Sequence, residues 1–128
     1  MGDSRWVLVV DDQKGVRRLL YEAFHLVGVP VEVAASGAEA LEKLGRREYS
    51  LMLLDVRMPA MTGLEALAEA RRRGHRLPVI LMSAYEDLSL IKEAGALDIL
   101  DHLIKPFDVM ELTQKITRWR ASPFEYRS

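Results

Sequence analysis

Short apolar runs alternate along this chain with segments whose apolar residues recur at helical spacing. Runs that are almost continuously apolar, as in parallel strands buried on both faces, occupy residues 6–10, 51–55 and 78–82. Shorter runs lie at 31–34 and about 102–104. Strands that alternate with helical segments are typical of βα units around a parallel sheet. The pattern therefore predicts an α/β fold with five strands.

Five helices are predicted between and after these strands. Four apolar residues at helical spacing form the core face of the first: Leu20, Ala23, Phe24 and Val27. Ser36 and Thr62 each precede a glutamate by three residues, the spacing of a capping box, and open helices that run to about 44 and 74. A fourth helix is predicted over about 87–95, and Asp108 caps a fifth that reaches about 119.

Length and composition limit the class of protein. The 128 residues suit one domain, and 49% hydrophobic with 29% charged residues is ordinary for a globular protein. A net charge of −1 provides no overall field for nucleic acid or membranes, and the absence of cysteine excludes disulfides and thiolate metal sites. Because no signal peptide or membrane span is recognisable, we expect a cytoplasmic protein. We expect one domain over 1–121 and a short tail over 122–128, with no output domain.

Polar residues stand where the apolar runs end: Asp11, Asp12, Asp55, Ser83 and Lys105. The carboxyl ends of parallel strands meet at one edge of a sheet, which is where ligands bind. Three carboxylates there suit a hard cation such as Mg²⁺, and a carboxylate so placed can attack phosphorus. A hydroxyl and an ammonium would bind the phosphoryl oxygens. Singly, each has a simpler reading: Asp12 as a helix N-cap, Ser83 bonded to backbone and Lys105 solvated.

The segment 55–63, DVRMPAMTG, resembles the motif around the phosphoacceptor aspartate of response-regulator receiver domains. The resemblance covers about residues 6–120, with the acid pair, acceptor, hydroxyl and Lys-Pro pair in the family's order. It implies a flavodoxin-like, doubly wound parallel sheet in the strand order 2-1-3-4-5, with helices on both faces. It further implies a cis peptide bond between Lys105 and Pro106.

The same resemblance implies roles for the site residues. Asp55 would accept a phosphoryl group from a phosphohistidine, while Ser83 and Lys105 contact its oxygens. Mg²⁺ would be held by four groups: the carboxylates of Asp11, Asp12 and Asp55 and the backbone carbonyl of Arg57. Ser83 would also act as a switch together with His102, which stands where many members carry an aromatic residue. On this reading the protein is not an enzyme.

The surroundings of the site resemble those of single-domain regulators of the sporulation phosphorelay in residues 10–13 (VDDQ), Gly15, 83–85 (SAY), His102 and 105–108 (KPFD). We therefore expect the phosphoryl group to pass to a downstream histidine. Val16 and Leu19 lie off the core face of the first helix and predict an apolar docking patch. We assign seven residues to partner docking: Gln13, Gly15, Val16, Leu19, Tyr85, Pro106 and Phe107. The implied partners are a sensor histidine kinase and a histidine phosphotransferase. We expect a monomer or weak dimer without direct nucleic-acid or membrane contacts.

One segment departs from the family pattern. The Gly-Ala pair that usually precedes the fifth strand is replaced by Asp98 and Ile99, while Gly95 and Ala96 come three residues earlier. We therefore expect the fourth helix to end early and 97–101 to form an unusual loop. In this family the fourth helix and the fifth strand form the usual output face, so the sequence leaves the choice of partner and the mode of dimerisation open.

Three alternatives remain. A haloacid-dehalogenase phosphatase needs a second aspartate two residues after the first, where this chain has Arg57. The receiver of a larger DNA-binding regulator is a second possibility, although the basic residues 71–73 also suit the end of a helix. A receiver that works without phosphorylation would usually lack an acid or the lysine, and neither is missing.

Overall fold

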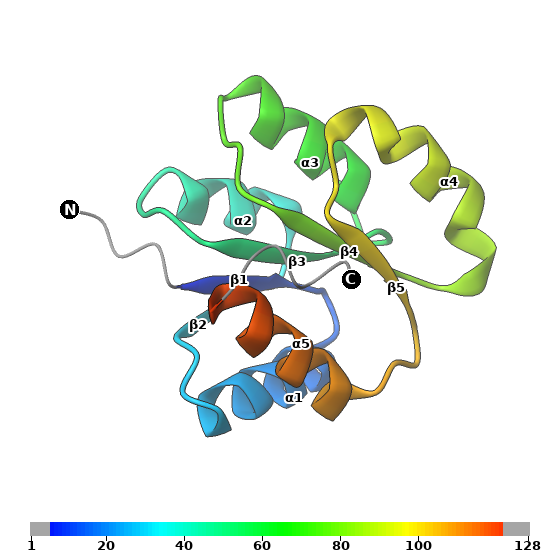
Figure 1. Cartoon of the computed structure of the whole chain (residues 1–128). Helices are drawn as coiled ribbons and strands as arrows, with labels where there is room; N and C mark the ends of the chain where they lie inside the picture. The colour runs from blue at the N-terminus through cyan, green and yellow to red at the C-terminus, as the bar shows by residue number, and fades with distance from the viewer. Residues whose placement is uncertain (1–5, 122–128) are drawn as a thin grey trace.

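Five parallel strands and the helices between them make up the part of the chain that the computed structural model describes, residues 6–121 apart from the side chains of 85, 94, 96 and 121 (Figure 1). The strands are β1 (Val7–Val10), β2 (Val31–Ala34), β3 (Leu51–Asp55), β4 (Val79–Ser83) and β5 (Asp101–Ile104). The helices are α1 (Lys14–Leu26), α2 (Gly37–Leu44), α3 (Gly63–Arg72), α4 (Leu88–Glu93) and α5 (Val109–Ala121). Two 3-10 turns, η1 (Tyr85–Asp87) and η2 (Ala94–Leu97), flank α4.

The strands form one sheet in the order β2-β1-β3-β4-β5, as the family resemblance implied. Every neighbouring pair is parallel, with Val10 beside Leu54 and Ser83 beside Ile104. The strand order reverses at β1, so the crevice of the doubly wound sheet opens where β1 and β3 end. That register brings the residues that follow Val10 next to Asp55.

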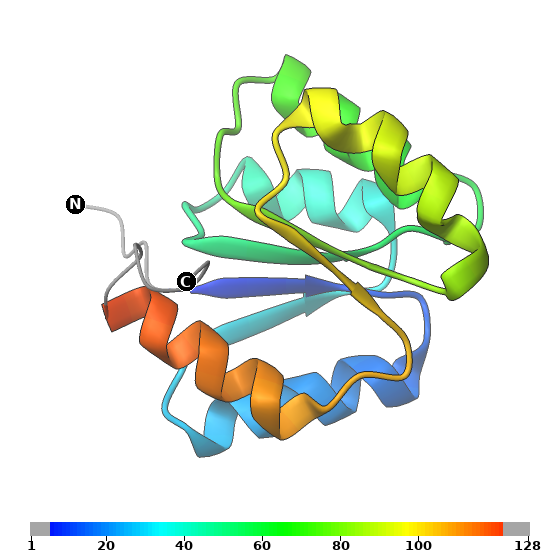
Figure 2. The same cartoon turned by 45° about the vertical axis from the view of Figure 1, so that its right-hand side comes forward.

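Helices cover both faces of the sheet, α1 and α5 on one side and α2, α3 and α4 on the other (Figures 1 and 2). Each face of the sheet has its own hydrophobic core, and alternate residues of β3 point into one or the other. Leu51 and Leu53 pack in the core under α1 and α5, and Met52 and Leu54 pack in the core on the opposite face. Both faces of the strand are therefore buried, which explains why the strand sequences are continuously apolar.

Helix α1 differs from its prediction at both ends. Its N-cap is Gln13, whose side chain makes no capping hydrogen bond, so the simpler alternative reading of Asp12 as the N-cap of this helix does not hold. Leu20 and Phe24 are fully buried as predicted, but Val27 is 41% exposed because the helix ends at Leu26. Val27 therefore does not belong to the core face.

The three predicted caps form to different extents. At α3 the capping box is complete, since Thr62 Oγ1 accepts from Glu65 N–H and the Glu65 carboxylate accepts from Thr62 N–H. At α2 the Ser36 hydroxyl accepts from the N3 amide, but the carboxylate of that residue, Glu39, accepts from Ala35 N–H instead. The second half of this box is thus displaced by one residue. Before α5, the Asp108 carboxylate accepts from Glu111 N–H at 3.0 Å.

The segment between β4 and β5 is less regular than predicted. Only Leu88–Glu93 is α-helical within the expected span 87–95, and 3-10 turns flank it on both sides. The early end predicted for this helix is confirmed. Asp98, at the position where the family usually has glycine, adopts a left-handed backbone with φ of 58°. Asp tolerates this conformation better than most residues with a side chain, which explains how the chain turns here without glycine.

Arg71 fastens this irregular segment to the end of α3. Its guanidinium donates to four backbone carbonyls at 2.8–2.9 Å: those of His75, Leu77, Leu97 and Asp98. The neighbouring Arg72 and Arg73 instead pair with Glu69 on their own helix. The basic cluster is thus committed to intramolecular contacts, and Arg71 has a structural role that its place in the sequence did not indicate.

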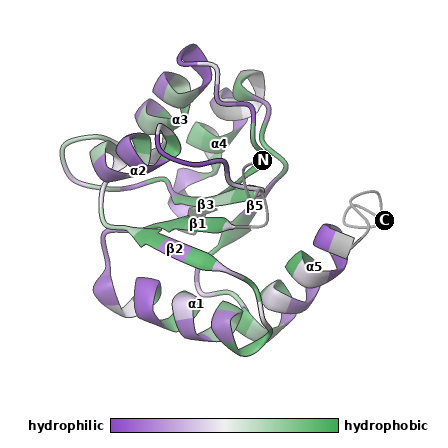
Figure 3. Cartoon of the chain, turned by 90° about the vertical axis from the view of Figure 1, so that its left-hand side faces the viewer, coloured by the Kyte–Doolittle hydropathy of each residue, from purple (hydrophilic) through white to green (hydrophobic). Residues whose placement is uncertain are grey.

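Colouring by hydropathy separates the apolar sheet from helices whose hydrophilic residues lie on their outer faces (Figure 3). Within residues 6–121, no helix combines the length and the apolar character needed to cross a bilayer.

Candidate functional site

Three carboxylates meet at the carboxyl ends of β1 and β3. Oxygen atoms of Asp11, Asp12 and Asp55 all lie within 4.8 Å of one another. Asp11 is fully buried, Asp55 is 6% exposed and Asp12 is open to solvent. The register of β1 with β3 produces this cluster, as the sequence predicted. Because the cluster combines two buried acids with one exposed acid, it offers a cation both oxygen ligands and access for water.

Lys105, from the end of β5, reaches into this cluster. Its ammonium donates to Asp11 Oδ2 at 2.7 Å and lies 3.7 Å from Asp55 Oδ1. Its peptide bond to Pro106 is cis, as expected. The second carboxylate oxygen of Asp11 accepts from Gln13 N–H at 2.9 Å. Both carboxylate oxygens of Asp11 are thereby held by hydrogen bonds, while Asp55 has only a longer contact with the Lys105 ammonium.

Ser83 carries the one buried side-chain oxygen or nitrogen, among the described residues, that has no hydrogen-bond partner. It closes β4, the strand next to β3 in the sheet, and is 1% exposed. A buried hydroxyl without a partner costs free energy, so such groups in folded proteins call for an explanation. The reading of Ser83 as a hydroxyl bonded to backbone does not hold here.

The site raises the pKa of Asp55 from 3.8 to about 7. Burial is the largest cause, followed by the negative charge of Asp11, with a further contribution from Asp12. Lys105 and the backbone N–H of Arg57 act in the opposite direction, because both stabilise the carboxylate. An excess of negative charge therefore remains at Asp55, which a divalent cation would neutralise.

Gly63 explains why α3 can begin so close to the acceptor strand. Its N–H donates to the Val56 carbonyl at 2.8 Å. A Cβ atom at this position would lie 2.0 Å from the Asp55 carbonyl oxygen, which no side chain could tolerate. The glycine of the motif is thus required by the approach of two backbones, directly behind Asp55.

Arg57 and Asp87 form an ion pair at the rim that sequence reasoning missed. Arg57 Nε donates to Asp87 Oδ1 at 2.5 Å, and Asp87 is only 1% exposed. Asp87 was expected only at the start of the fourth helix. Its position four residues after Ser83 carries no motif, so only the fold could reveal this contact.

Four of the seven predicted docking residues line an apolar groove between α1 and the β5–α5 connection. The groove has a volume of about 380 Å³ and is lined by Val16, Leu19, Leu20, Lys105, Pro106, Phe107 and Val109. Leu19 is 53% exposed, whereas Val16 packs partly against the core. Gly15 is exposed with open space around it, and Gln13 is exposed beside the acids. Gln13 and Gly15 thus lie at the start of α1 but do not line the groove, and Tyr85 has a side chain outside the described part of the chain.

His102 lies on β5 with its side chain exposed. Its backbone N–H donates to the Asp101 carboxylate at 2.8 Å. The structure therefore places His102 two strands away from the acceptor, at the outer edge of the sheet. Its role as a switch partner of Ser83 stays a prediction.

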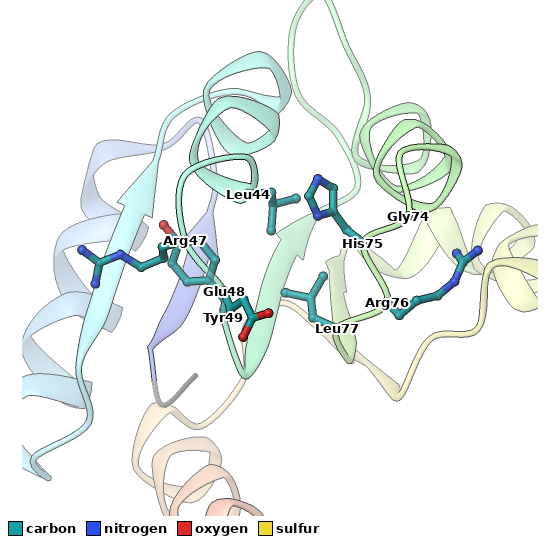
Figure 4. Close-up of a pocket in the computed structure, with 8 residues that line it drawn as sticks. All are labelled: Leu44, Arg47, Glu48, Tyr49, Gly74, His75, Arg76 and Leu77. Atoms are coloured by element: carbon teal, nitrogen blue, oxygen red, sulfur yellow. The ribbon is translucent and has the colours of Figure 1, made fainter. Parts of the chain in front are cut away.

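A second hollow of about 400 Å³ lies at the amino-terminal ends of the strands, where the loops that precede β3 and β4 meet (Figure 4). The guanidinium groups of Arg47 and Arg76 point away from it in opposite directions. Arg47 stacks over Trp6, 4.3 Å from the ring centroid, and lies 3.5 Å from Glu32, which also accepts from the Tyr49 hydroxyl. These contacts stabilise the edge of the sheet near β2 and are separate from the Asp55 cluster.

The doubly wound sheet, with its acids and lysine at the carboxyl edge, defines the class of flavodoxin-like α/β proteins that bind ligands at the switch point of the strand order. Residues 7–117 match the family model described as the response regulator receiver domain. The chain belongs to this family, the receiver domains of two-component response regulators.

Two relatives are similar over nearly the same span. Sporulation initiation phosphotransferase F of Bacillus subtilis (strain 168) is 37% identical over 113 residues, which are 88% of this chain and 91% of that protein. The regulatory protein AtoC of Escherichia coli (strain K12) is 41% identical over 112 residues, but these make up only 24% of its length.

Solved structures agree with the fold. The chemotaxis protein CheY4 of Vibrio cholerae superposes with a TM-score of 0.82 at 29% identity, covering 91% of this chain and 98% of that one. The response regulator protein TrrA of Thermotoga maritima, solved in complex with Mg²⁺ and BeF, has a TM-score of 0.77 at 32% identity and covers 89% and 97% of the two chains. The resemblance stated from the sequence is therefore confirmed at the level of family and fold.

Proposed function

We propose that Asp55 is the phosphoacceptor of this receiver and takes a phosphoryl group from a phosphohistidine on a sensor kinase. The observation that carries the proposal is that Asp55 and Ser83 end neighbouring strands, β3 and β4, at the same edge of the sheet. A nearly buried carboxylate stands beside an acid cluster, and the neighbouring strand ends in a buried hydroxyl without a partner. That hydroxyl and the ammonium of Lys105 would donate to the oxygens of the incoming group.

In the proposed reaction, an Asp55 oxygen forms a bond to phosphorus while the phosphorus–nitrogen bond of the phosphohistidine breaks. The electron pair of that bond stays on the imidazole, and the product on Asp55 is an acyl phosphate. The nucleophile is the ionised carboxylate, so the pKa of about 7 makes its availability depend on the neutralisation of charge. We regard the chain as an acceptor and donor of this group, not as an enzyme with a separate substrate.

The donor set suits Mg²⁺. Asp11, Asp12 and Asp55 provide carboxylate oxygens, and the backbone carbonyl of Arg57 is our proposed further ligand. Mg²⁺ prefers few carboxylates and several waters, which fits a cluster with one exposed member. When bound, the ion would screen the repulsion between Asp55 and the phosphoryl oxygens.

We further propose a stand-alone phosphorelay intermediate that passes the group to a histidine phosphotransferase. The groove beside the acids supports this, because Leu19 and Val16 offer an apolar surface next to Lys105 and Pro106 for a helix that carries the partner histidine. The match to the Bacillus subtilis phosphotransferase over 91% of its length supports it too. We expect a monomer or weak dimer in the cytoplasm, without direct contacts to nucleic acid or membrane.

The alternative is the receiver of a longer transcriptional regulator. It is supported by the 41% identity to the regulatory protein AtoC, a longer protein of which the matched residues are 24%. Sequencing the gene beyond codon 128 separates the two proposals, since an in-frame DNA-binding module would replace the relay reading.

Incubation with acetyl phosphate and Mg²⁺, followed by intact mass measurement, tests the acceptor. We expect one added phosphoryl group in the wild-type protein and none in Asp55→Asn. The control is Asp98→Asn, which removes an exposed carboxylate remote from β3 and should label normally. Equal labelling of the Asp55 variant, or an unlabelled wild type, would contradict the assignment.

A further inference from the structure

Asp87 is a buried carboxylate that lies outside the strand-end cluster and is bound from two sides. Its Oδ1 accepts from Arg57 Nε at 2.5 Å, and its Oδ2 accepts from Ala84 N–H at 3.1 Å. Its own N–H donates to the Ala84 carbonyl at 3.0 Å, which closes the turn after β4. Asp87 is thus part of the β4–α4 loop and holds a residue of the β3–α3 loop.

Both loops carry groups of the phosphoacceptor site. Arg57 follows Asp55 by two residues, and its backbone N–H donates to the Asp55 carboxylate. Ala84 directly follows Ser83, the buried hydroxyl without a partner. The Arg57–Asp87 pair therefore connects the loop of the acceptor with the loop of the hydroxyl, at the carboxyl edge of adjacent strands.

The unequal burial of the two partners distinguishes this contact from an ordinary surface ion pair. The Arg57 side chain is 66% exposed, whereas that of Asp87 is 1% exposed. Exposed pairs hold their side chains only weakly. A buried carboxylate that loses its cation, by contrast, is left uncompensated, so the arginine side chain is confined to one direction. Confining that side chain also restricts the Arg57 backbone, which the acceptor carboxylate contacts.

We propose that Asp87 is a positioning residue that, through Arg57, fixes the backbone of the β3–α3 loop for Mg²⁺ binding and for phosphorylation of Asp55. The inference rests on the proposed acceptor function and adds a residue to it. Arg57 thereby has two tasks: its backbone serves the acceptor and the metal, and its side chain anchors that backbone to Asp87. Removing either side chain would loosen the same loop, so the two residues should act as one unit.

A double-mutant cycle tests this unit with Asp87→Asn, Arg57→Gln and the double variant. The asparagine keeps the shape of Asp87 and an oxygen for Ala84 N–H. Two quantities are measured on folded protein: the Mg²⁺ dissociation constant by isothermal titration calorimetry, and the initial rate of labelling by acetyl phosphate at saturating Mg²⁺. The matched control is Glu42→Gln, which breaks the exposed Arg46–Glu42 pair on α2, away from the site.

We expect Asp87→Asn to weaken Mg²⁺ binding and to slow labelling, each by about fivefold, because small displacements of catalytic groups are costly. In the Arg57→Gln background the same substitution should change either quantity by less than about twofold, since the unit is already broken. The control should match the wild type. A purely structural role would lower the unfolding midpoint of Asp87→Asn without changing the Mg²⁺ affinity of the folded protein.

Wild-type values in folded Asp87→Asn, or equal effects in both backgrounds, would overturn the inference and leave the acceptor assignment intact. A wild-type protein that takes up no phosphoryl group would overturn both. If Asp87→Asn does not fold, the same two measurements on variants of the exposed Arg57 test the inference. Arg57→Gln should lose about fivefold in Mg²⁺ affinity and labelling rate, and Arg57→Lys should keep most of both. Equal values for wild type, Gln and Lys would then refute the role of the pair.

Discussion

Replacing Asp55 by asparagine should stabilise this protein at pH 8. In the folded state the pKa of Asp55 is raised from 3.8 to about 7, mainly by burial and by Asp11, so the ionised carboxylate is disfavoured there relative to the unfolded chain. Between these two pKa values the folded state binds more protons than the unfolded state. The wild-type free energy of unfolding therefore falls as pH rises through this window, and no further once Asp55 is ionised in both states.

The size of the effect follows from the two pKa values. A shift of one pKa unit corresponds to about 1.4 kcal/mol, so the cost of ionised Asp55 approaches about 4 kcal/mol above pH 7. At pH 5 the folded carboxyl is mostly protonated, and the cost falls to about 2 kcal/mol. Asparagine removes this cost at both pH values. We therefore expect Asp55→Asn to raise the free energy of unfolding by about 2 kcal/mol more at pH 8 than at pH 5.

Urea unfolding in EDTA at pH 5 and pH 8, followed by circular dichroism, measures this difference. An unchanged slope of the free energy against urea would show that both proteins unfold from comparable states. Glu22→Gln is the control, because it removes a carboxylate only from the exposed Arg18–Glu22 pair on α1, and its effect should stay within about 0.5 kcal/mol. A destabilised Asp55→Asn, or the same gain at both pH values, would refute the argument that the site holds excess negative charge.

Four further results follow from the same contacts. Mg²⁺ at a hundred times its dissociation constant should stabilise the wild type by about 2.7 kcal/mol, and Asp12→Asn should lose most of this gain in thermal unfolding. Leu19→Glu should slow transfer from a phosphorylated histidine partner at least about tenfold and leave labelling by acetyl phosphate within about twofold; parallel losses would contradict a docking role. Replacing Ala60, whose φ is 67°, by glycine should raise the free energy of unfolding by about 1 kcal/mol, and a lower unfolding midpoint would disprove backbone strain there. Gly63→Ala should cost several kcal/mol or abolish folding, because its Cβ would meet the Asp55 carbonyl oxygen at 2.0 Å; a wild-type midpoint would exclude that clash.

The strands and the acceptor cluster could be predicted from the sequence because they depend on short-range patterns. Strands buried on both faces must be continuously apolar, and polar residues that end such strands must meet at one edge of a parallel sheet. Asp11, Asp55 and Lys105 therefore lie together as predicted. Helix ends were predicted less well, because Val27 fits the local pattern of the core face of α1 but is 41% exposed where the helix ends.

By itself, the sequence determined the α/β class, the five strands, the family and the residues gathered at the carboxyl edge. Only the tertiary structure decided which side chains outside a motif complete that edge. The ion pair of Arg57 with Asp87 and the contacts of Arg71 with the carbonyls of Leu97 and Asp98 join segments about thirty residues apart, and no local periodicity encodes such contacts. Ser83 illustrates the same division. Its place at the end of a strand was visible in the sequence, but its buried, unpaired hydroxyl depends on every element packed around it.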